Sequence, residues 1–408
     1  MSKINNEEEI REVIVEKNVG FNMIEVIVMI IISILFGILV GSVVSNSRKT
    51  VDGVKVSHEL QEFITTYNNI NDNYYGKISE QELVSAAIEG MITKLDDPYS
   101  VYMDNKETEN FNTTIDGSYT GIGATVSSKD GNNYIVSLFD KSPAEKSGLK
   151  VGDIFVKVNG KDVKGMELDK LTSLIKGKAN TVVDITVLRD GKEITKTITR
   201  SSIDILSFTS KVIEKNKKKV GYIYISTFAA NSYKQFNKEL SKLEKENIDS
   251  LIIDVRSNPG GHLTQVTKIL ELFMDKKKVI YQVESKGKRI KKYSTTAVKR
   301  DYNVSVLINP ASASASEILA AAFKESYDKA TLVGEKSYGK GTVQKAYQLS
   351  NGASFKYTTE KWLTPKGNWI DKAGVKPDVE VKLDEKYKKD PSDKNDLQLQ
   401  KALDILTK

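Results

Sequence analysis

Two segments of the chain combine residue types that suit acyl transfer. Residues 254–261 read DVRSNPGG, and paired glycines let backbone N–H groups approach a substrate closely, although they would equally make a tight turn. Residues 309–323 read NPASASASEILAAAF, which places Ser312, Ser314 and Ser316 where an apolar strand runs into an alanine-rich helix. A helix N-terminus stabilises developing negative charge, so these serines are candidates for nucleophilic attack as well as for helix capping.

A serine nucleophile needs a base, and the composition narrows the choice. The chain has no cysteine and only two histidines, which argues against thiol chemistry, disulfides and a histidine-rich metal centre. We expect neither a metal nor another cofactor. His58 falls in a helical region and reads as a surface or packing residue; His262 follows the double glycine, and we favour a packing role over a Ser/His site. A lysine is the remaining candidate.

Lysine acts as a base only when its pKa is depressed. Lowering that pKa from about 10.4 towards 8 requires roughly 3 kcal/mol against the charged form, which burial or a nearby positive charge supplies. Lys340 lies between two glycines in GEKSYGKGTVQ, residues 334–344. Gln344, four residues later, is placed to orient the amine by a hydrogen bond.

Length and charge indicate how many folded units the chain has and which partners it binds. A chain of 408 residues exceeds one ordinary domain, so we expect two or three folded units plus an anchor. The net charge of +7 comes from 61 basic and 54 acidic residues scattered along the chain, which indicates a lysine-rich solvated surface. No recognisable nucleic-acid motif accompanies it, so we expect no nucleic-acid partner.

One segment predicts a membrane span. Residues 26–44 are 19 consecutive uncharged residues, about the length that crosses a bilayer core, and no signal-peptidase-like site follows them. Basic residues on both sides leave the orientation open. Gly20 and Glu25, just before the run, resemble a prepilin-type leader, so processing after Gly20 is an alternative to an intact N-terminus.

The remaining pattern predicts the elements that position the candidate residues. Residues 58–95 have helical periodicity, and residues 117–202 form short β-rich runs around a helix at 168–175. Beyond residue 208, strands alternate with helices at 232–245, 263–274 and 314–324. Such alternation predicts an α/β domain with a largely parallel sheet, in which functional groups gather where strands end.

Seven segments, in order, resemble the carboxyl-terminal processing peptidases, or tail-specific proteases, of peptidase family S41. They are GMITKLDDPYSVYM (from Gly90), YTGIGATV (from Tyr119), SPAEKSGLKVGDIFVKVNG (from Ser142), DVRSNPGG, SASASEI (from Ser312), YGKGTVQ (from Tyr338) and TPKGNWIDKAGVKPDVEV (from Thr364). The resemblance implies a serine endopeptidase with Ser314 as nucleophile, Lys340 as general base and Gln344 as its orienting partner. It implies oxyanion donors at Ala315 and at Gly260 or Gly261.

The chain departs from the family pattern at two places. Pro310 and Ala311 stand where the family usually has a glycine before the serines, and about one extra residue lies near 326–329, between serine and lysine. If that residue moves Lys340 out of hydrogen-bond reach of Ser314, we expect a misaligned resting enzyme that substrate activates.

The β-rich module resembles a PDZ domain, whose groove captures a peptide C-terminus as an added strand. The resemblance implies that the GIGA segment, Gly121, Ile122, Gly123 and Ala124, forms its carboxylate-binding loop. We therefore expect protein substrates with accessible apolar C-terminal tails, a single-pass membrane protein with its catalytic part outside the cytoplasm, and a possible homodimer. A weaker prediction is that Arg189, at the end of a strand in this module, contacts the protease core.

The expected fold is a multidomain α/β protein with a crotonase-like Ser/Lys protease core. Its parts are a cytoplasmic segment (1–25), a transmembrane anchor (26–44), a linker (45–57), a helical region (58–116), a PDZ domain (117–203), the protease core (204–384) and a helical C-terminal tail associated with that core (385–408). Two other functions stay open: a noncatalytic PDZ scaffold that binds tails, and a pilus-associated membrane component.

Overall fold

The computed structural model describes residues 23–24, 50–51, 54–55, 57–297 and 300–408. The chain divides into two compact units, residues 1–87 and 88–408. The predicted transmembrane anchor (26–44) and the possible processing site after Gly20 lie outside the described residues. Among the residues that are described, no helix combines the length and apolar character needed to cross a bilayer.

The first unit is built mainly from helices. A short ribbon of β1 (Thr50–Val51) and β2 (Val54–Lys55) precedes α2 (His58–Asn73), and α3 (Glu80–Thr93) begins in this unit. The hydroxyl of Ser57 caps α2 by accepting from the Leu60 N–H. The helical periodicity of residues 58–95 is thus confirmed as two helices, and no residue of α2 is buried.

A small β module occupies residues 124–199 of the second unit. Its sheet has the order β10-β9-β7-β6-β5, with β8 paired to β7. The strands are β5 (Ala124–Lys129), β6 (Asn132–Leu138), β7 (Ile154–Val158), β8 (Lys161–Asp162), β9 (Val182–Arg189) and β10 (Lys192–Thr199). Helices α5 (Pro143–Lys146) and α6 (Leu168–Ile175) complete it. The predicted helix at 168–175 is confirmed. A two-stranded ribbon of β4 (Ser118–Gly121) and β11 (Ser201–Asp204) brackets the module.

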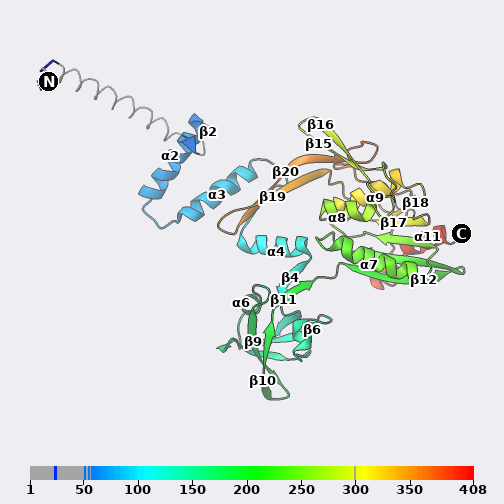
Figure 1. The fold of residues 1–408 in the computed structure, drawn as a ribbon, viewed down its shortest axis with the longest axis horizontal. Coiled ribbons are helices and arrows are strands. Elements are labelled where there is room, and N and C mark those ends of the chain that lie inside the picture. Colours follow the sequence, from blue (N-terminus) through cyan, green and yellow to red (C-terminus); the bar gives the residue numbers. More distant parts are fainter. Residues whose placement is uncertain (1–22, 25–49, 52–53, 56, 298–299) are drawn as a thin grey trace, which may run out of the picture. The chain divides into compact units, whose positions relative to one another are not determined.

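The region expected to form the protease core, residues 204–384, contains the predicted parallel sheet. Its order is β12-β13-β14-β17-β18-β21, and only β12 and β13 run antiparallel. Figure 1 labels β12, β17 and β18 of this sheet. The strands are β12 (Phe208–Lys215), β13 (Lys218–Ile225), β14 (Ser250–Asp254), β17 (Asn303–Ile308), β18 (Ala330–Gly334) and β21 (Val379–Glu380). Every residue of β14 is buried, as expected for a strand covered on both faces.

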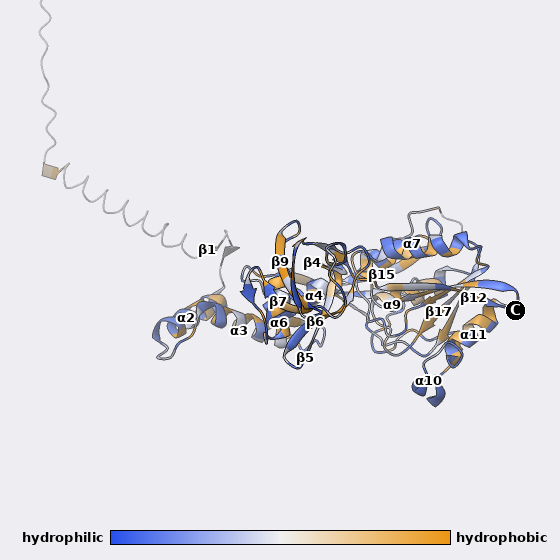
Figure 2. Ribbon diagram, turned by 90° about the horizontal axis from the view of Figure 1, so that it is seen from below, coloured by the Kyte–Doolittle hydropathy of each residue, from blue (hydrophilic) through white to orange (hydrophobic). Residues whose placement is uncertain are grey.

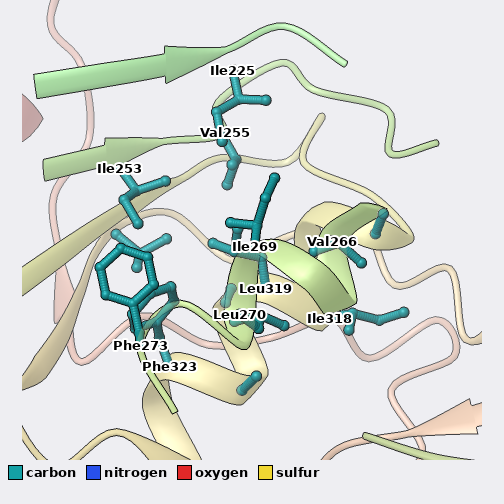
Figure 3. Close-up of a cluster of buried hydrophobic side chains, with 14 of the residues drawn as sticks. Ile225, Ile253, Val255, Val266, Ile269, Leu270, Phe273, Ile318, Leu319 and Phe323 are labelled. Carbon is teal, nitrogen blue, oxygen red and sulfur yellow. The ribbon is translucent and has the colours of Figure 1, made fainter. Parts of the chain in front are cut away.

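Helices cover both faces of this sheet. One face packs against α7 (Ser232–Lys245), α8 (Leu263–Leu270) and α9 (Ala315–Ser326), and Figure 3 shows Ile253 and Val255 meeting Ile269 and Leu319 in that layer. The other face packs against α11 (Leu397–Leu406), through Leu399 among others. Figure 2 shows hydrophobic colouring on α11 and a hydrophilic α10 (Glu385–Lys389). The predicted association of the C-terminal tail with the core is what the described residues show.

A second sheet was not predicted from the sequence. It has the order β16-β15-β20-β19, with β3 paired to β20. The strands are β15 (Val279–Ser285), β16 (Lys288–Tyr293), β19 (Thr342–Gln348), β20 (Ser354–Leu363) and β3 (Val101–Met103). Residues 101–103, in the stretch expected to be helical, therefore form an edge of the sheet that carries the lysine segment. Helix α4 (Asn105–Asp116) follows β3 and ends at Gly117 in the left-handed conformation.

Candidate active site

Ser314 lies where β17 turns into α9, as the sequence predicted for a functional serine. Its neighbours Ser312 and Ser316 are fully buried, and their hydroxyls donate to the carbonyl oxygens of Val255 (2.8 Å) and Asn258 (2.9 Å). Both therefore fasten the serine segment to the neighbouring strand end. Ser314 is only half-buried and has φ 54° and ψ −114°, a backbone conformation that non-glycine residues rarely adopt. Of the three serines, only Ser314 faces the cavity described below.

The double glycine lies directly against this serine. A Cβ at Gly260 would come within 2.8 Å of both the Ala313 oxygen and the Ser314 Cβ, so only glycine allows the approach. The Gly260 N–H donates to Asn258 Oδ1 (2.8 Å) and is occupied. Among the described residues, the N–H groups of Gly261 and Ala315 have no hydrogen-bond acceptor, and both residues line the cavity.

A buried ionic cluster anchors the strand end before the glycines. The Arg256 guanidinium donates to Asp254 Oδ2 (2.6 Å) and to Asp396 Oδ2 (2.8 Å), and the Tyr222 hydroxyl also donates to Asp254 (2.7 Å). Burial would lower the pKa of Arg256, but the two carboxylates outweigh it and raise that pKa. Because Asp396 precedes α11, the C-terminal helix is tied to the glycine loop.

Glu317 joins the serine segment to the lysine segment. This fully buried carboxylate accepts hydrogen bonds from the N–H of Ser314 (2.8 Å), Gly339 (2.7 Å) and Lys340 (2.9 Å), and from the Ser337 hydroxyl (2.6 Å). Burial raises its pKa, and the four donors oppose that effect. The sequence analysis gave Glu317 no role, although it stands three residues after the serine at a helix start, where such a residue often bonds back.

Two indole rings hold the lysine segment from the other side. Trp362 Nε1 donates to the carbonyl oxygen of Lys340 (2.7 Å), and Trp369 Nε1 donates to that of Gly341 (2.9 Å). Asp371 Oδ1 accepts from the Gly341 N–H (3.1 Å). The backbone on both sides of the Lys340 side chain is therefore fixed. Trp369 and Asp371 lie in one of the segments that carry the family resemblance, but neither was predicted to bind the lysine segment.

The Lys340 side chain is half-buried and lies over an aromatic ring. Its Nζ is 4.6 Å from the ring centroid of Tyr99. Burial lowers the pKa of Lys340, and the positive charge of Lys356 lowers it further, while Asp97 and Glu317 oppose the shift. Burial and contact with Tyr338 raise the pKa of Tyr99 to about 12, so its ring stays a neutral platform. A lowered pKa is what the proposed role of a lysine as base requires.

The dyad is not closed by a hydrogen bond. Among the described residues no hydrogen bond joins Ser314 Oγ to Lys340 Nζ. Gln344 lines the same cavity, but its Nε2 donates to Thr342 Oγ1 (2.9 Å) and Thr358 Oγ1 (3.0 Å) rather than to the amine. A bulge between Val343 and Gln344 shifts this strand. The arrangement matches the misaligned resting state that the extra residue between serine and lysine had suggested.

One cavity of about 540 Å³ brings these groups together. It is lined by Ser314, Ala315, Lys340, Gln344, Gly260 and Gly261, so all the predicted catalytic and oxyanion residues share it. His262 also lines it, but its buried Nε2 has no hydrogen-bond partner in the described part of the chain, which argues against a Ser/His pair. No cluster of three or more metal-ligating side chains was found among the described residues.

A second, apolar cavity of about 210 Å³ lies on the β module. Gly121, Ile122, Gly123 and Ala124 line it together with Ile175 of the facing helix α6, as expected for a peptide groove. Arg189 does not reach the core: it pairs with the buried Asp153 (2.6 Å) inside the module. That weak prediction from the sequence is wrong, because the carboxylate within reach is local.

Helix α4 contributes to both cavities. Its residue Thr113 lines the apolar groove, whereas Phe111, Thr114 and Ile115 line the cavity that holds Ser314. Helix α4 falls within the helical region predicted at residues 58–116, but none of its residues was predicted to line either cavity.

Comparisons with known proteins show which family the sequence resembles. Peptidase family S41 matches residues 219–381, a PDZ domain matches residues 135–189, and the activating protease CtpB N-terminal domain matches residues 41–108. The chain is 39% identical over 366 residues to the carboxy-terminal processing protease CtpB of Bacillus subtilis, covering 88% of this chain and 73% of that protein.

A second relative is also a carboxy-terminal processing protease. The carboxy-terminal processing protease CtpA of Bacillus subtilis is 42% identical over 320 residues, covering 78% of this chain and 68% of that protein. Among solved structures, the photosystem II D1 C-terminal processing protease matches with a TM-score of 0.47 and 24% identity, covering 86% of this chain and 98% of that one. The chain therefore belongs to peptidase family S41, among the carboxy-terminal processing proteases with a PDZ domain.

Proposed function

We propose that this chain is a serine endopeptidase that cleaves protein substrates near their C-termini with a Ser314/Lys340 dyad. The observation that carries the proposal is the single cavity in which a half-buried serine, a lysine of lowered pKa and two unoccupied backbone N–H groups face one another. Ser314 donates its proton to neutral Lys340 as its oxygen attacks the scissile carbonyl carbon.

The oxyanion donors in this mechanism are the N–H groups of Ala315 and Gly261. Gly260 is the less suitable donor because its N–H already binds Asn258. Collapse of the tetrahedral intermediate breaks the peptide C–N bond, and the Lys340 ammonium returns the proton to the leaving amine. Lys340 then takes a proton from the water that attacks the acyl-enzyme, and returns it to Ser314 Oγ as the bond between that oxygen and the acyl carbon breaks.

Substrate selection in this proposal begins in the apolar groove. An unstructured apolar tail binds beside residues 121–124 as an added strand, and its binding moves Lys340 from the Tyr99 ring to within hydrogen-bond reach of Ser314. In that aligned state we expect the side-chain oxygen of Gln344 to accept a hydrogen bond from the Lys340 amine. The resting geometry of the dyad and the shared helix α4 support this view.

We further propose a single-pass membrane protein with its catalytic part outside the cytoplasm. The apolar run at 26–44 and the family resemblance support the anchor and its orientation. Addition of protease to intact cells should digest the part of the chain after residue 45 and spare the part before residue 25. N-terminal sequencing of the native protein decides between Met1 and Phe21 as the first residue, and with it the pilus-related alternative.

Catalysis is tested with an unfolded reporter protein that ends in an apolar tail. We expect the wild-type chain to shorten the reporter, and Ser314→Ala and Lys340→Ala to leave it intact while still binding its tail. Reporter that is bound but never cut by the wild type would support the noncatalytic scaffold instead. Proteomic comparison of a Ser314→Ala strain with the wild type should then show which proteins keep longer tails.

A further inference from the structure

The cavity around Ser314 has an unbalanced charge. Two lysines, Lys340 and Lys356, line it, and no aspartate or glutamate does so among the described residues. The rest of its wall is largely apolar and includes Phe111, Ile318 and Trp362. A cavity of this composition is complementary to a ligand that carries apolar groups and one negative charge.

Three carboxylates beside Lys340 or its neighbouring backbone already accept hydrogen bonds. Asp97 accepts from the hydroxyls of Ser100 (2.5 Å) and Thr358 (2.6 Å), and Glu317 accepts from its four donors. Asp371 accepts from the Gly341 N–H. None of these groups pairs with Lys356.

Lys356 is held in place without a counter-ion. It lies on β20 opposite Ala346 of β19, and its Nζ is 4.9 Å from the ring centroid of Phe111 on α4. In the described part of the chain its amine makes no ion pair and no hydrogen bond to protein. Burial lowers the pKa of Lys356, which reflects the cost of keeping an unpaired charge partly out of water.

We propose that Lys356 forms a carboxylate-binding subsite of the catalytic cavity and is therefore a determinant of substrate specificity. This inference rests on the proposed protease function. An acidic side chain close to the scissile bond would pair with the Lys356 amine, while its apolar neighbours would contact Phe111 and Ile318. A charge-assisted hydrogen bond in a partly dry cavity is strong enough to select among substrates.

The carboxylate that pairs with the Lys356 amine has a second source, the C-terminus of the substrate. The chain end of a short tail, like an aspartate or glutamate side chain, presents two anionic oxygens. Helix α4 lines both this cavity and the apolar groove, so a tail that lies along α4 from one to the other passes the Phe111–Lys356 pair. The experiment therefore separates the two sources.

Peptides based on a tail that the wild-type chain cleaves provide the test. After the scissile bond is mapped by mass spectrometry, each flanking position is made Glu or Gln in turn, and each peptide is prepared with a free C-terminal carboxylate and with a C-terminal amide. We expect kcat/KM to favour Glu over Gln at one position by roughly tenfold or more, as a charge-assisted hydrogen bond would. If the terminal carboxylate is the ligand, the free acid is favoured over the amide instead.

Three substitutions assign the preference to Lys356. Lys356→Met, which keeps the length of the side chain without its charge, should reduce the ratio to about one, and Lys356→Arg should retain it. Lys356→Glu should favour a Lys peptide over its Gln partner at the same position. Each ratio is taken within one variant, so any change in fold or in Lys340 affects both peptides equally.

The outcomes are distinguishable. A wild-type chain that cleaves every peptide without charge preference, or a Lys356→Met variant that keeps the wild-type preference, overturns the subsite and leaves the protease function intact. If instead the wild-type chain, like Ser314→Ala, cleaves neither the peptides nor the reporter, the protease function fails and the subsite fails with it.

Discussion

At the scale of single residues, the catalytic power proposed for this chain depends on the ionisation of one amine. Only neutral Lys340 accepts a proton, so kcat/KM should rise with pH through the pKa of Lys340. Burial and the charge of Lys356 lower that pKa below its ordinary value of 10.5, so the midpoint of the rise should lie below 10.5. Initial rates of reporter cleavage across a pH series measure it.

Two variants serve as controls for that profile. Lys340→Arg should be inactive at every pH, because a guanidinium does not deprotonate in this range. Lys356→Met removes a positive neighbour and should move the midpoint to higher pH. A rise centred at or above 10.5 in the wild type would contradict the lowered pKa.

Glu317 offers a second prediction at this scale. Its four hydrogen-bond donors suit a carboxylate, and Glu317→Gln would set an amide NH2 against some of them. We expect kcat to fall by on the order of a hundredfold, because the backbone of Ser314 and Lys340 would lose its common acceptor. Glu325→Gln is the control on the same helix, since Glu325 accepts only from the exposed Lys366 N–H (2.7 Å). Equal activity of both variants would remove Glu317 from the site.

Sequence reasoning reached these residues unevenly. Absence of cysteine and scarcity of histidine made a lysine base plausible, but the family resemblance was needed to select Ser314 over its two neighbours. The structure explains why Ser314 is the better candidate, because the hydroxyls of Ser312 and Ser316 donate hydrogen bonds to backbone carbonyl groups. Glu317 was missed although one of its donors, the Ser314 N–H, is only three residues away; its donors in the lysine segment are 20 to 23 residues away. Lys356 was missed because its aromatic neighbour Phe111 lies on another element.

At the scale of elements, the glycine loop is a tight contact between two strand ends. Gly260→Ala would place a Cβ within 2.8 Å of the Ser314 Cβ, at a φ of +106° that alanine rarely adopts. We expect activity to fall below one-hundredth of the wild-type value, because a displacement of roughly 1 Å is costly at a reaction centre. The measurement is kcat/KM beside the melting temperature.

The matched control is Gly131→Ala. Gly131 also has a positive φ, +75°, but a Cβ there would meet no atom within 4 Å. Both substitutions should destabilise the fold by about 1 kcal/mol or more, and only the one at Gly260 should abolish cleavage. Loss of cleavage in both would attribute the effect to stability.

The elements themselves were largely predictable. Apolar runs such as SLIIDVR gave the buried parallel strands, and the helix at 232–245 agrees with its prediction residue for residue. The sheet containing β19 and β20 was not foreseen, because polar and charged residues interrupt the apolar residues of SFKYTTEKWL, and the pairings of β20 with β15 and with β3 join distant parts of the sequence. Long-range pairing of that kind has no local signal.

At the scale of the whole molecule, the proposed function assigns recognition of the tail and cleavage to separate cavities. Val126→Glu puts a charge in the wall of the apolar groove and should raise KM for an apolar-tailed reporter by roughly tenfold, with a smaller change in kcat. Val136→Glu is the control, since Val136 is exposed on the adjacent strand. If the two variants have the same KM, the groove does not bind the tail.

The first unit bears on assembly. Leu60, Phe63 and Ile64 of α2 are between 40% and 49% exposed, which leaves an apolar face without a partner in the described residues of that unit. We expect a homodimer through this face, and Phe63→Glu should shift the detergent-solubilised full chain to monomer in analytical ultracentrifugation. Tyr75→Glu, at a residue 98% exposed, should leave the dimer intact. A wild-type monomer would refute the expectation.

The two indole rings on the lysine segment also have a spectroscopic meaning. The chain has two tryptophans. Trp362 donates to the carbonyl oxygen of Lys340, and Trp369 donates to that of Gly341. Excitation of tryptophan therefore reports on a few residues around Lys340, the proposed general base, and on little else. The protein carries its own optical probe, and stopped-flow emission after mixing with a tail peptide would time the movement of that segment without any attached dye.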